Sequence, residues 1–171
     1  MNNSLIRIEK LLDTDLDELR KVSQEIWYAH YSQIISIEQI EYMLNLMYGV
    51  GVIENEILNQ GIFYDKVLKN DQVVGYLSYG TEIKNNIIYL KLHKCYLLPS
   101  LHGLGYGQIM LNHIYKQAEN MNLKQIILNV NKGNEKGIKA YTRFGFRIIA
   151  SEIKDIGGRF VMDDYIMGYD L

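Results

Sequence analysis

Three glycines stand at alternate positions in the stretch LLPSLHGLGYGQIML, which covers residues 97–111. An apolar, strand-like run precedes Gly103, Gly105 and Gly107, and a helical pattern follows them. Glycine weakens regular structure, so this clustering predicts a backbone that must approach a ligand closely. A loop that opens a helix suits an anion, because its amide N–H groups are free and the helix dipole favours negative charge.

The two common phosphate-binding loops do not fit these residues. A nucleoside-triphosphate loop closes with Gly-Lys-Ser/Thr, whereas Gln-Ile-Met follows Gly107. A dinucleotide-binding loop needs a third glycine where this chain has Gln108. It also needs an acidic residue near the end of the next strand, where this chain has Asn129 and Val130.

The hydrophobic periodicity predicts a single mixed α/β domain over residues 1–171. Before the loop we expect a short strand, two helices, a further helical turn and three strands, at 5–8, 13–31, 36–47, 54–61, 62–69, 72–80 and 86–98. After it we expect a helix, a strand, a helix and two strands, at 108–121, 124–130, 134–145, 146–153 and 159–171. The order β-αα-βββ-α-β-α-ββ indicates a largely antiparallel sheet of about six to seven strands with about four helices.

Composition limits the partners of this domain. The net charge is −2, so nonspecific electrostatic binding to nucleic acid or anionic lipid is not expected. The single cysteine, Cys95, excludes an internal disulfide and a cysteine-built zinc site, and we expect no metal. The N-terminal MNNSLIRIEK has no apolar signal core, and no stretch approaches the ~20 apolar residues of a membrane span. We therefore expect a cytoplasmic protein.

Two motifs resemble those of one family. HGLGYG, residues 102–107, is similar to the signature of the Gcn5-related N-acetyltransferases (GNAT): Gln or Arg, two residues, Gly, one residue, Gly or Ala. His102 takes the Gln/Arg place. NVNKGNEKGIKAYTRFGF, residues 129–146, resembles the family's second segment and places Asn134, Tyr141 and Gly145 at the expected spacings. The resemblance implies a GNAT-like fold in a bacterial-type, single-domain member.

By this resemblance the cofactor is acetyl-coenzyme A. Its pyrophosphate would lie on the loop formed by His102, Gly103, Leu104, Gly105, Tyr106, Gly107 and Gln108. Its pantetheine arm would pair with the backbone of Tyr96 and Leu97, where the fourth and fifth strands splay apart. Asn134 and Arg143 are further candidate contacts. One departure is that His102 lacks the fixed charge of Arg. The other is Gly137, which stands where the family usually has Ala and would loosen its helix by ~1 kcal/mol.

Two residues are candidates for the chemistry. The family's tyrosine at the place of Tyr141 donates a proton to the coenzyme thiolate; the alternative is a core aromatic residue. Several members place Glu or His at the position of His93, which would deprotonate the amine; the alternative is a structural histidine. Strict alternation puts His93 on one strand face with Tyr89, Lys91, Cys95 and Leu97, unless a bulge interrupts the strand. His30 and His113 are expected to be structural or exposed.

The acceptor is less defined by the sequence. Trp27, Tyr28 and Tyr31, with Asp163 and Asp164, could receive a cationic amine, which favours a polyamine over a peptide N-terminus, an amino acid or an aminoglycoside. The alternative is that the aromatic residues pack in the core and the aspartates lie on a hairpin surface.

The acetyl group would pass directly from acetyl-coenzyme A to the amine while both are bound, in a ternary complex. Two other classes remain open, a catalytically weak acyl-coenzyme A sensor and an interaction module. Homodimers are common in such folds, but nothing in the sequence identifies an interface.

Overall fold

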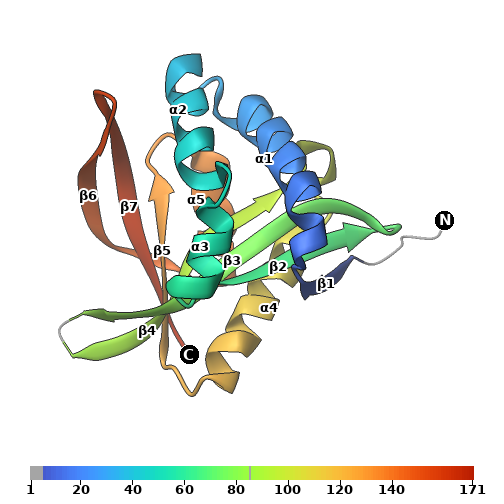
Figure 1. The fold of residues 1–171 in the computed structure, drawn as a ribbon. Coiled ribbons are helices and arrows are strands. Elements are labelled where there is room, and N and C mark those ends of the chain that lie inside the picture. The colour runs from blue at the N-terminus through green and yellow to red at the C-terminus, as the bar shows by residue number, and fades with distance from the viewer. Residues whose placement is uncertain (1–5, 85) are drawn as a thin grey trace.

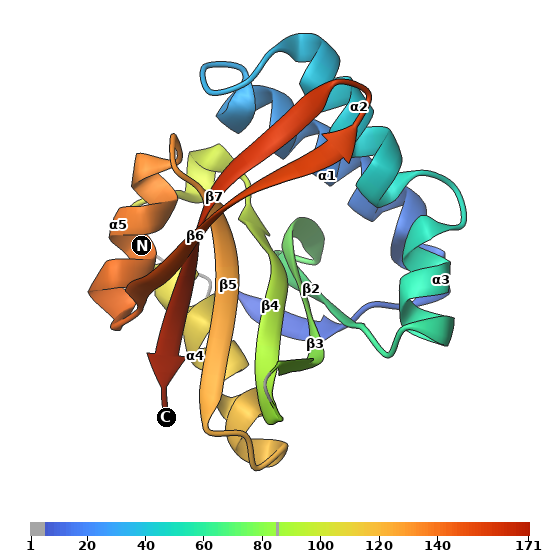
Figure 2. The same ribbon diagram turned by 90° about the vertical axis from the view of Figure 1, so that its left-hand side faces the viewer.

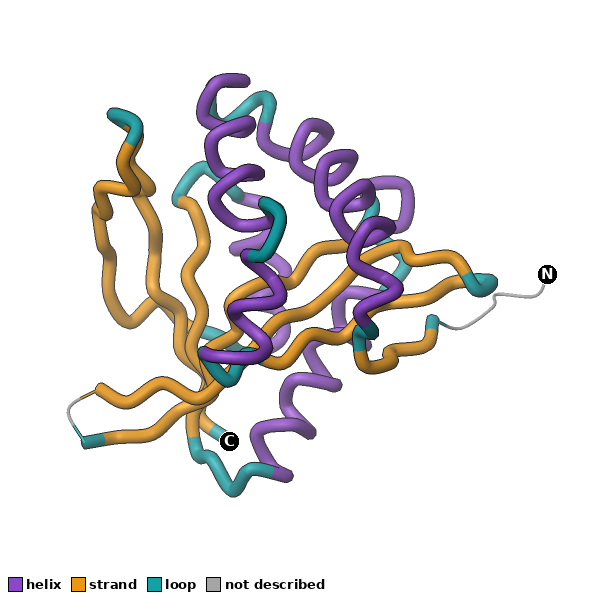
Figure 3. Tube along the Cα trace, viewed as in Figure 1, coloured by secondary structure: helices purple, strands orange, loops and turns teal. Residues whose placement is uncertain are grey.

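The computed structural model describes residues 6–84 and 86–171 as a mostly antiparallel seven-stranded sheet with helices on both faces (Figures 1 and 3). The strands are β1 (Arg7–Lys10), β2 (Phe63–Lys69), β3 (Gln72–Lys84), β4 (Ile87–Leu97), β5 (Gln125–Asn131), β6 (Arg147–Gly157) and β7 (Phe160–Asp170). The helices are α1 (Leu16–Tyr31), α2 (Ile37–Tyr48), α3 (Val52–Asn59), α4 (Tyr106–Asn120) and α5 (Glu135–Phe144), with short 3₁₀ turns at Asp13–Asp15 and Pro99–Leu101.

The predicted fold class and element order are confirmed, with one correction to the helix count. Residues 54–59 of the stretch 54–61, expected as a helical turn, belong to a full helix, α3, so the described residues form five α-helices rather than about four. Gly51 directly precedes the first residue of α3. Its φ of 81° lies in the left-handed region, which favours glycine. β1 lies slightly later than the predicted 5–8, and residue 5 lies outside the described residues.

Two hydrophobic cores lie on opposite faces of the sheet. α1, α2 and α3 cover one face (Figure 2), where Trp27, Ile40 and Ile53 are almost fully buried in one cluster with Tyr76. α4 and α5 cover the other face, where the apolar side of α4 packs on strands β3, β4 and β5. No helix within the described residues is long and apolar enough to cross a membrane.

The sheet opens between its two central strands. The strand order is β1-β2-β3-β4-β5-β7-β6, and among the described strands β4 and β5 form the only parallel pair. That pairing covers Leu90–Leu92 against Ile126–Leu128, although β4 continues to Leu97 and β5 to Asn131. Beyond Leu92 the two strands therefore diverge, and the backbone of β4 on this side has no partner in β5.

A β-bulge lies in β4 at the point of divergence. Ser78 of β3 pairs with Lys94 and Tyr79 pairs with Leu92, so His93 is the extra residue. A bulge inserts one residue and reverses the alternation of side chains beyond it. It also re-aims side chains, and bulges are common beside active sites.

The bulge corrects the predicted facing of β4. Strict alternation grouped Cys95 and Leu97 with Lys91 and His93, and this was wrong. Cys95 and Leu97 instead pack with Leu90 in the core beneath α4. Lys94, which alternation placed opposite His93, points toward α3, where its ammonium meets a carboxylate of that helix.

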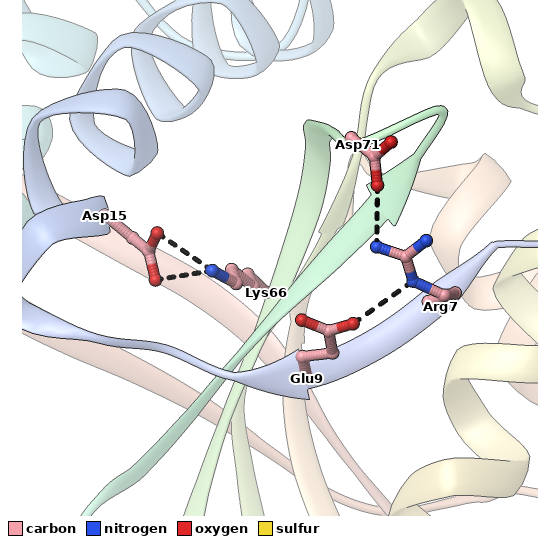
Figure 4. Close-up of polar contacts among 5 residues, drawn as sticks. All are labelled: Arg7, Glu9, Asp15, Lys66 and Asp71. Atoms are coloured by element: carbon pink, nitrogen blue, oxygen red, sulfur yellow. Dashed lines mark hydrogen bonds and ion pairs between the residues drawn. The ribbon is translucent and has the colours of Figure 1, made fainter.

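The first strand is fixed by ion pairs at the sheet edge (Figure 4). Arg7 donates to Glu9 at 3.1 Å and to Asp71, in the β2–β3 turn, at 2.8 Å. Lys66 of β2 donates to both carboxylate oxygens of Asp15 at 2.8 Å. These contacts connect β1 and the start of α1 to the β2–β3 hairpin.

Candidate active site

A cavity of about 940 Å³ fills the opening between β4 and β5 and extends between α1, α2 and α5. Its lining brings together most of the residues that the sequence singled out: Trp27, Tyr31, His93, Tyr96, Leu97, His102, Gly103, Gly107, Asn134, Tyr141, Arg143 and Asp164. One cleft therefore joins both sequence motifs to the bulged strand.

The glycine loop presents an open backbone at one end of the cleft. Gly103 and Gly105 adopt φ values of 78° and 84°, and a Cβ at either position, or at Gly107, would meet no atom within 4 Å. Among the described residues, the amides of Gly103, Leu104, Gly105 and Gly107 donate to no backbone carbonyl. Free amides ahead of α4 are the groups that would meet an anion in the predicted loop.

The other residues of the loop have contacts of their own. His102 places Nε2 at 2.9 Å from the carbonyl oxygen of Leu97, so its ring is directed at the backbone of β4. Gln108 donates to the carbonyl of Ala140 at 3.4 Å and links α4 to α5. The Leu104 side chain is exposed, whereas the Tyr106 ring is buried in the core on the α4 side of the sheet.

The start of α5 contributes polar and basic groups to the same end. Asn134 caps this helix, accepting from the amide of Gly137 at 2.9 Å. A Cβ on residue 137 would lie 2.6 Å from the Asn134 amide nitrogen, which explains why glycine stands there. Lys136, Lys139 and Arg143 also line the cleft and give this end a positive charge.

Tyr141 lies where the two strands diverge. Its hydroxyl neighbours the thiol of Cys95, and its ring packs edge-on against Phe146, with 5.8 Å between ring centroids. Burial first, and then the neighbouring Cys95, raises the pKa of Tyr141 well above its usual value. Burial also raises the pKa of the Cys95 thiol to about 12. Tyr141 therefore keeps its proton at neutral pH and can act as a proton donor.

His93 projects from the bulge into the cleft. Although part of the residue is exposed, desolvation of the ring, followed by the charges of Lys94 and Lys91, lowers the pKa of His93 to about 4. The ordinary pKa of histidine is near 6.5, so the surroundings of His93 lower its pKa substantially. His93 is therefore neutral around pH 7 and able to accept a proton or a hydrogen bond, though as a weaker base than expected.

The other end of the cleft is acidic. Glu82 of β3, Glu152 of β6 and Asp164 of β7 line it, and one carboxylate oxygen of Asp164 is buried without a hydrogen-bond partner. Burial, as the first cause, raises the pKa of Asp164. Lys91 lies among these carboxylates. Its ammonium donates to the side-chain carbonyl of Asn129 across the fork, as we call the opening between β4 and β5 beyond Leu92.

Of the five residues predicted to contact the acceptor, some line the cleft and others lie outside it. Trp27 and Tyr31 are buried in the wall of the cleft, where the Tyr31 hydroxyl lies 3.3 Å from that of Tyr96. Tyr28 lies outside the cleft lining and donates to Glu41 at 3.5 Å.

The two aspartates of the β6–β7 hairpin differ in the same way. Asp163 lies outside the lining and pairs with Lys132 at 2.5 Å, while Asp164 faces the cleft. Only Trp27, Tyr31 and Asp164 therefore stay as candidate acceptor contacts.

Several cleft residues were missed by the sequence analysis. His30 was expected to be structural or exposed, yet it lines the cleft, as Asn134 does. Glu82, Glu152 and Lys91 come from three different strands, so only the assembled sheet brings them together. His113, in contrast, lies away from this cleft and pairs with Asp65 at 2.7 Å. Within the described residues, no group of three His, Cys, Asp or Glu side chains is placed to hold a metal ion.

The model of the acetyltransferase (GNAT) family matches residues 16–146. The chain belongs to this family. It is therefore an acetyl-coenzyme A-dependent N-acetyltransferase, and its fold is the GNAT fold. The open glycine loop, the unpartnered edge of β4 and the basic start of α5 fit this coenzyme.

Individual relatives agree with this assignment. The chain is 26% identical over 162 residues to the spermidine N(1)-acetyltransferase of Thermoplasma acidophilum, covering 92% of this chain and 96% of the relative. It is similar to the crystal structure of PaiA N-acetyltransferase from Thermoplasma acidophilum in complex with coenzyme A, with a TM-score of 0.80 and 25% identity over 97% and 99% of the two chains. A GCN5-related N-acetyltransferase from Rhodopseudomonas palustris shares the fold, with a TM-score of 0.81 at 14% identity over 100% and 99%.

Proposed function

We propose that this N-acetyltransferase acetylates a primary amine of a small polycation such as a polyamine. The observation that carries this proposal is the separation of charge along the cleft. Lys136, Lys139 and Arg143 stand at the phosphate-binding end, while three carboxylates, those of Glu82, Glu152 and Asp164, stand at the other. A carboxylate attracts an ammonium group strongly where water is partly excluded. A polycation could place one amine at the fork and its remaining charges among the carboxylates.

In the proposed reaction both substrates are bound together and the acetyl group passes directly to the amine. Acetyl-coenzyme A supplies the activated acetyl group. The amides of the loop hold the phosphates, and the open edge of β4 at Tyr96 and Leu97 orients the arm that carries the acetyl group. Neutral His93 accepts a proton from the amine, directly or through water, and Tyr141 donates its proton to the leaving sulfur.

Similarity to the Thermoplasma acidophilum enzyme supports the choice of acceptor. That relative is named for acetylating spermidine, and the match spans almost the whole of both chains. The charge pattern of the cleft is an independent observation, because it comes from the strands that surround the acceptor end. A sensor or an interaction module would not need acidic groups at this end.

The test is a panel of acceptors assayed with acetyl-coenzyme A: spermidine, spermine, a neutral-side-chain amino acid, a peptide N-terminus and an aminoglycoside. We expect the polyamines to give the highest kcat/KM. Glu152→Gln should raise KM for spermidine several-fold with a smaller effect on kcat, because it removes an attraction present in both the ground and transition states. Lys139→Gln is the matched charge variant at the cofactor end and should instead weaken coenzyme binding. Equal activity on the amino acid and on spermidine would contradict the proposal.

A further inference from the structure

Lys91 is an amine inside the cleft itself. It lies on β4 two residues before the bulge, at the vertex of the fork, and lines the same cavity as His93 and Tyr141. At about 3.3 Å of rise per strand residue, its backbone is about 6.6 Å from that of His93. A lysine side chain is long enough to cover this interval. The Lys91 ammonium can therefore occupy the place where an acceptor amine must enter.

The groups that surround the Lys91 ammonium are the same ones that would bind the ammonium of an acceptor. Its nitrogen donates to Asn129 on β5, and the carboxylates of Glu82, Glu152 and Asp164 are its charged neighbours. Lys84, on the β3–β4 hairpin, adds a positive charge. Burial is the largest influence and lowers the pKa of Lys91, so the neutral amine is more accessible than for a surface lysine.

We propose that Lys91 is a site of self-acetylation when acetyl-coenzyme A is bound and no acceptor is present. The lone pair of the neutral Lys91 nitrogen forms a bond to the thioester carbonyl carbon, and the carbon–sulfur bond breaks. The nitrogen loses its proton to His93 or to water, and the sulfur takes a proton from Tyr141. The products are Nε-acetyl-lysine at position 91 and coenzyme A.

This modification would change the acceptor end in a defined way. The acetylated side chain is neutral and longer, so acetylation removes a cation that faces Glu82, Glu152 and Asp164, and the acetyl group occupies the entrance to the fork. Transfer to a free amine and transfer to Lys91 compete for the same acetyl group. The inference rests on the catalytic roles proposed for His93 and Tyr141, but it does not depend on which amine is the natural acceptor.

The test is to incubate the purified full chain with acetyl-coenzyme A alone and to follow the intact mass and the peptide map. We expect one added acetyl group, on Lys91, at a rate independent of protein concentration. The rate should rise with pH and level off below 10.5, the ordinary lysine value. Lys91→Arg should abolish the modification, and Tyr141→Phe should slow it at least tenfold. Lys154→Arg, at another cleft-lining lysine, should leave it unchanged.

Two results would overturn the proposal. One is acetyl spread evenly over exposed lysines such as Lys139, and the other is a rate proportional to protein concentration, which would show transfer between molecules. A second arm contains spermidine at saturating concentration and should slow the modification of Lys91. If Lys91 is acetylated equally fast in both arms, self-acetylation stands and the polyamine assignment fails.

Discussion

The hydroxyl of Tyr141 and the thiol of Cys95 are neighbouring groups across the gap between α5 and β4. Desolvation keeps both groups protonated at neutral pH, because it raises the pKa of the tyrosine hydroxyl and of the thiol. The tyrosine side chain lines the cleft beside the opening of the sheet, which is where a leaving sulfur would need a proton.

Tyr141→Phe should lower kcat by ~10²-fold or more, because a positioned acid typically contributes ~10²–10⁴-fold. The phenyl ring keeps its packing against Phe146, so the affinity for acetyl-coenzyme A should stay within about twofold of that of the unmodified chain. Steady-state kinetics and calorimetric titration separate the two quantities. A variant that retains full kcat would remove Tyr141 from the role of proton donor.

The low pKa of His93 predicts an effect on stability as well as on activity. An unfolded histidine titrates near 6.5, whereas His93 in the folded chain titrates at about 4. Between these values the unfolded state binds the extra proton, so this residue makes the fold less stable as the pH falls from about 6.5 to 4. Above 6.5 both states are neutral at this position and the effect is absent.

His93→Gln should therefore lose less stability between pH 7 and pH 5 than the unmodified chain does, as measured by urea unfolding at both values. In a nuclear magnetic resonance titration the His93 ring should remain neutral down to pH 5. A midpoint near 6.5 would contradict the environment described for this ring. The activity profile should also show no limb near pH 6.5 that depends on His93.

A buried ion pair holds the bulged strand to α3. The Lys94 ammonium lies 2.8 Å from Glu56 and 2.5 Å from the Tyr64 hydroxyl, and its side chain is only 4% exposed. Removing one partner of a buried pair typically costs ~3–5 kcal/mol, whereas replacing both by apolar groups is often neutral. We expect Glu56→Leu to lower the free energy of unfolding by about 3 kcal/mol.

The double variant Glu56→Leu with Lys94→Met should recover much of that loss. Urea unfolding of the two single variants and the double variant gives the coupling free energy directly. If the double variant loses as much free energy of unfolding as the two single variants together, the ion pair does not anchor β4 to α3. Glu9→Gln, in an exposed pair with Arg7, is the matched control and should change stability by less than about 1 kcal/mol.

Two glycines of the loop should respond differently to alanine. Gly105 has a φ of 84°, so Gly105→Ala strains the backbone by about 1–2 kcal/mol and should lower both stability and coenzyme affinity. Gly107 lies in the first turn of α4 with open space around it, so Gly107→Ala leaves the fold unstrained. Its methyl group would still stand beside the free amides.

We therefore expect Gly107→Ala to keep the Tm while weakening coenzyme A binding in a calorimetric titration. Unchanged binding would show that the phosphates do not approach residue 107. A fall in Tm as large as that of Gly105→Ala would show that the loop needs glycine here for folding instead.

Local sequence signals were sufficient for much of this structure. The glycine loop depends on residues that are neighbours along the chain, so the sequence predicts it. The role expected for Tyr141 came from the family resemblance, and the structure places its side chain in the lining of the cleft. The order of the elements followed from the hydrophobic periodicity and agrees with the fold.

Other features depend on contacts that no short stretch contains. The bulge at His93 exists only in the pairing of β4 with β3, and Lys94 beside it is anchored by Glu56 from α3. The acidic end of the cleft joins β3, β6 and β7, so it appears only when the sheet is assembled. Alternation along β4 could not show either feature, because it treats the strand as isolated from its neighbours.

The short pairing of β4 with β5 has a consequence for the lifetime of the protein. Only three residue pairs join these two strands, and the coenzyme arm is expected to bond to the edge of β4 that they leave open. The ligand thus completes the sheet as a missing strand would, and whatever binds the folded state alone also stabilises it. Binding of acetyl-coenzyme A is therefore expected to slow proteolysis of the chain, because it lowers the population of the opened state.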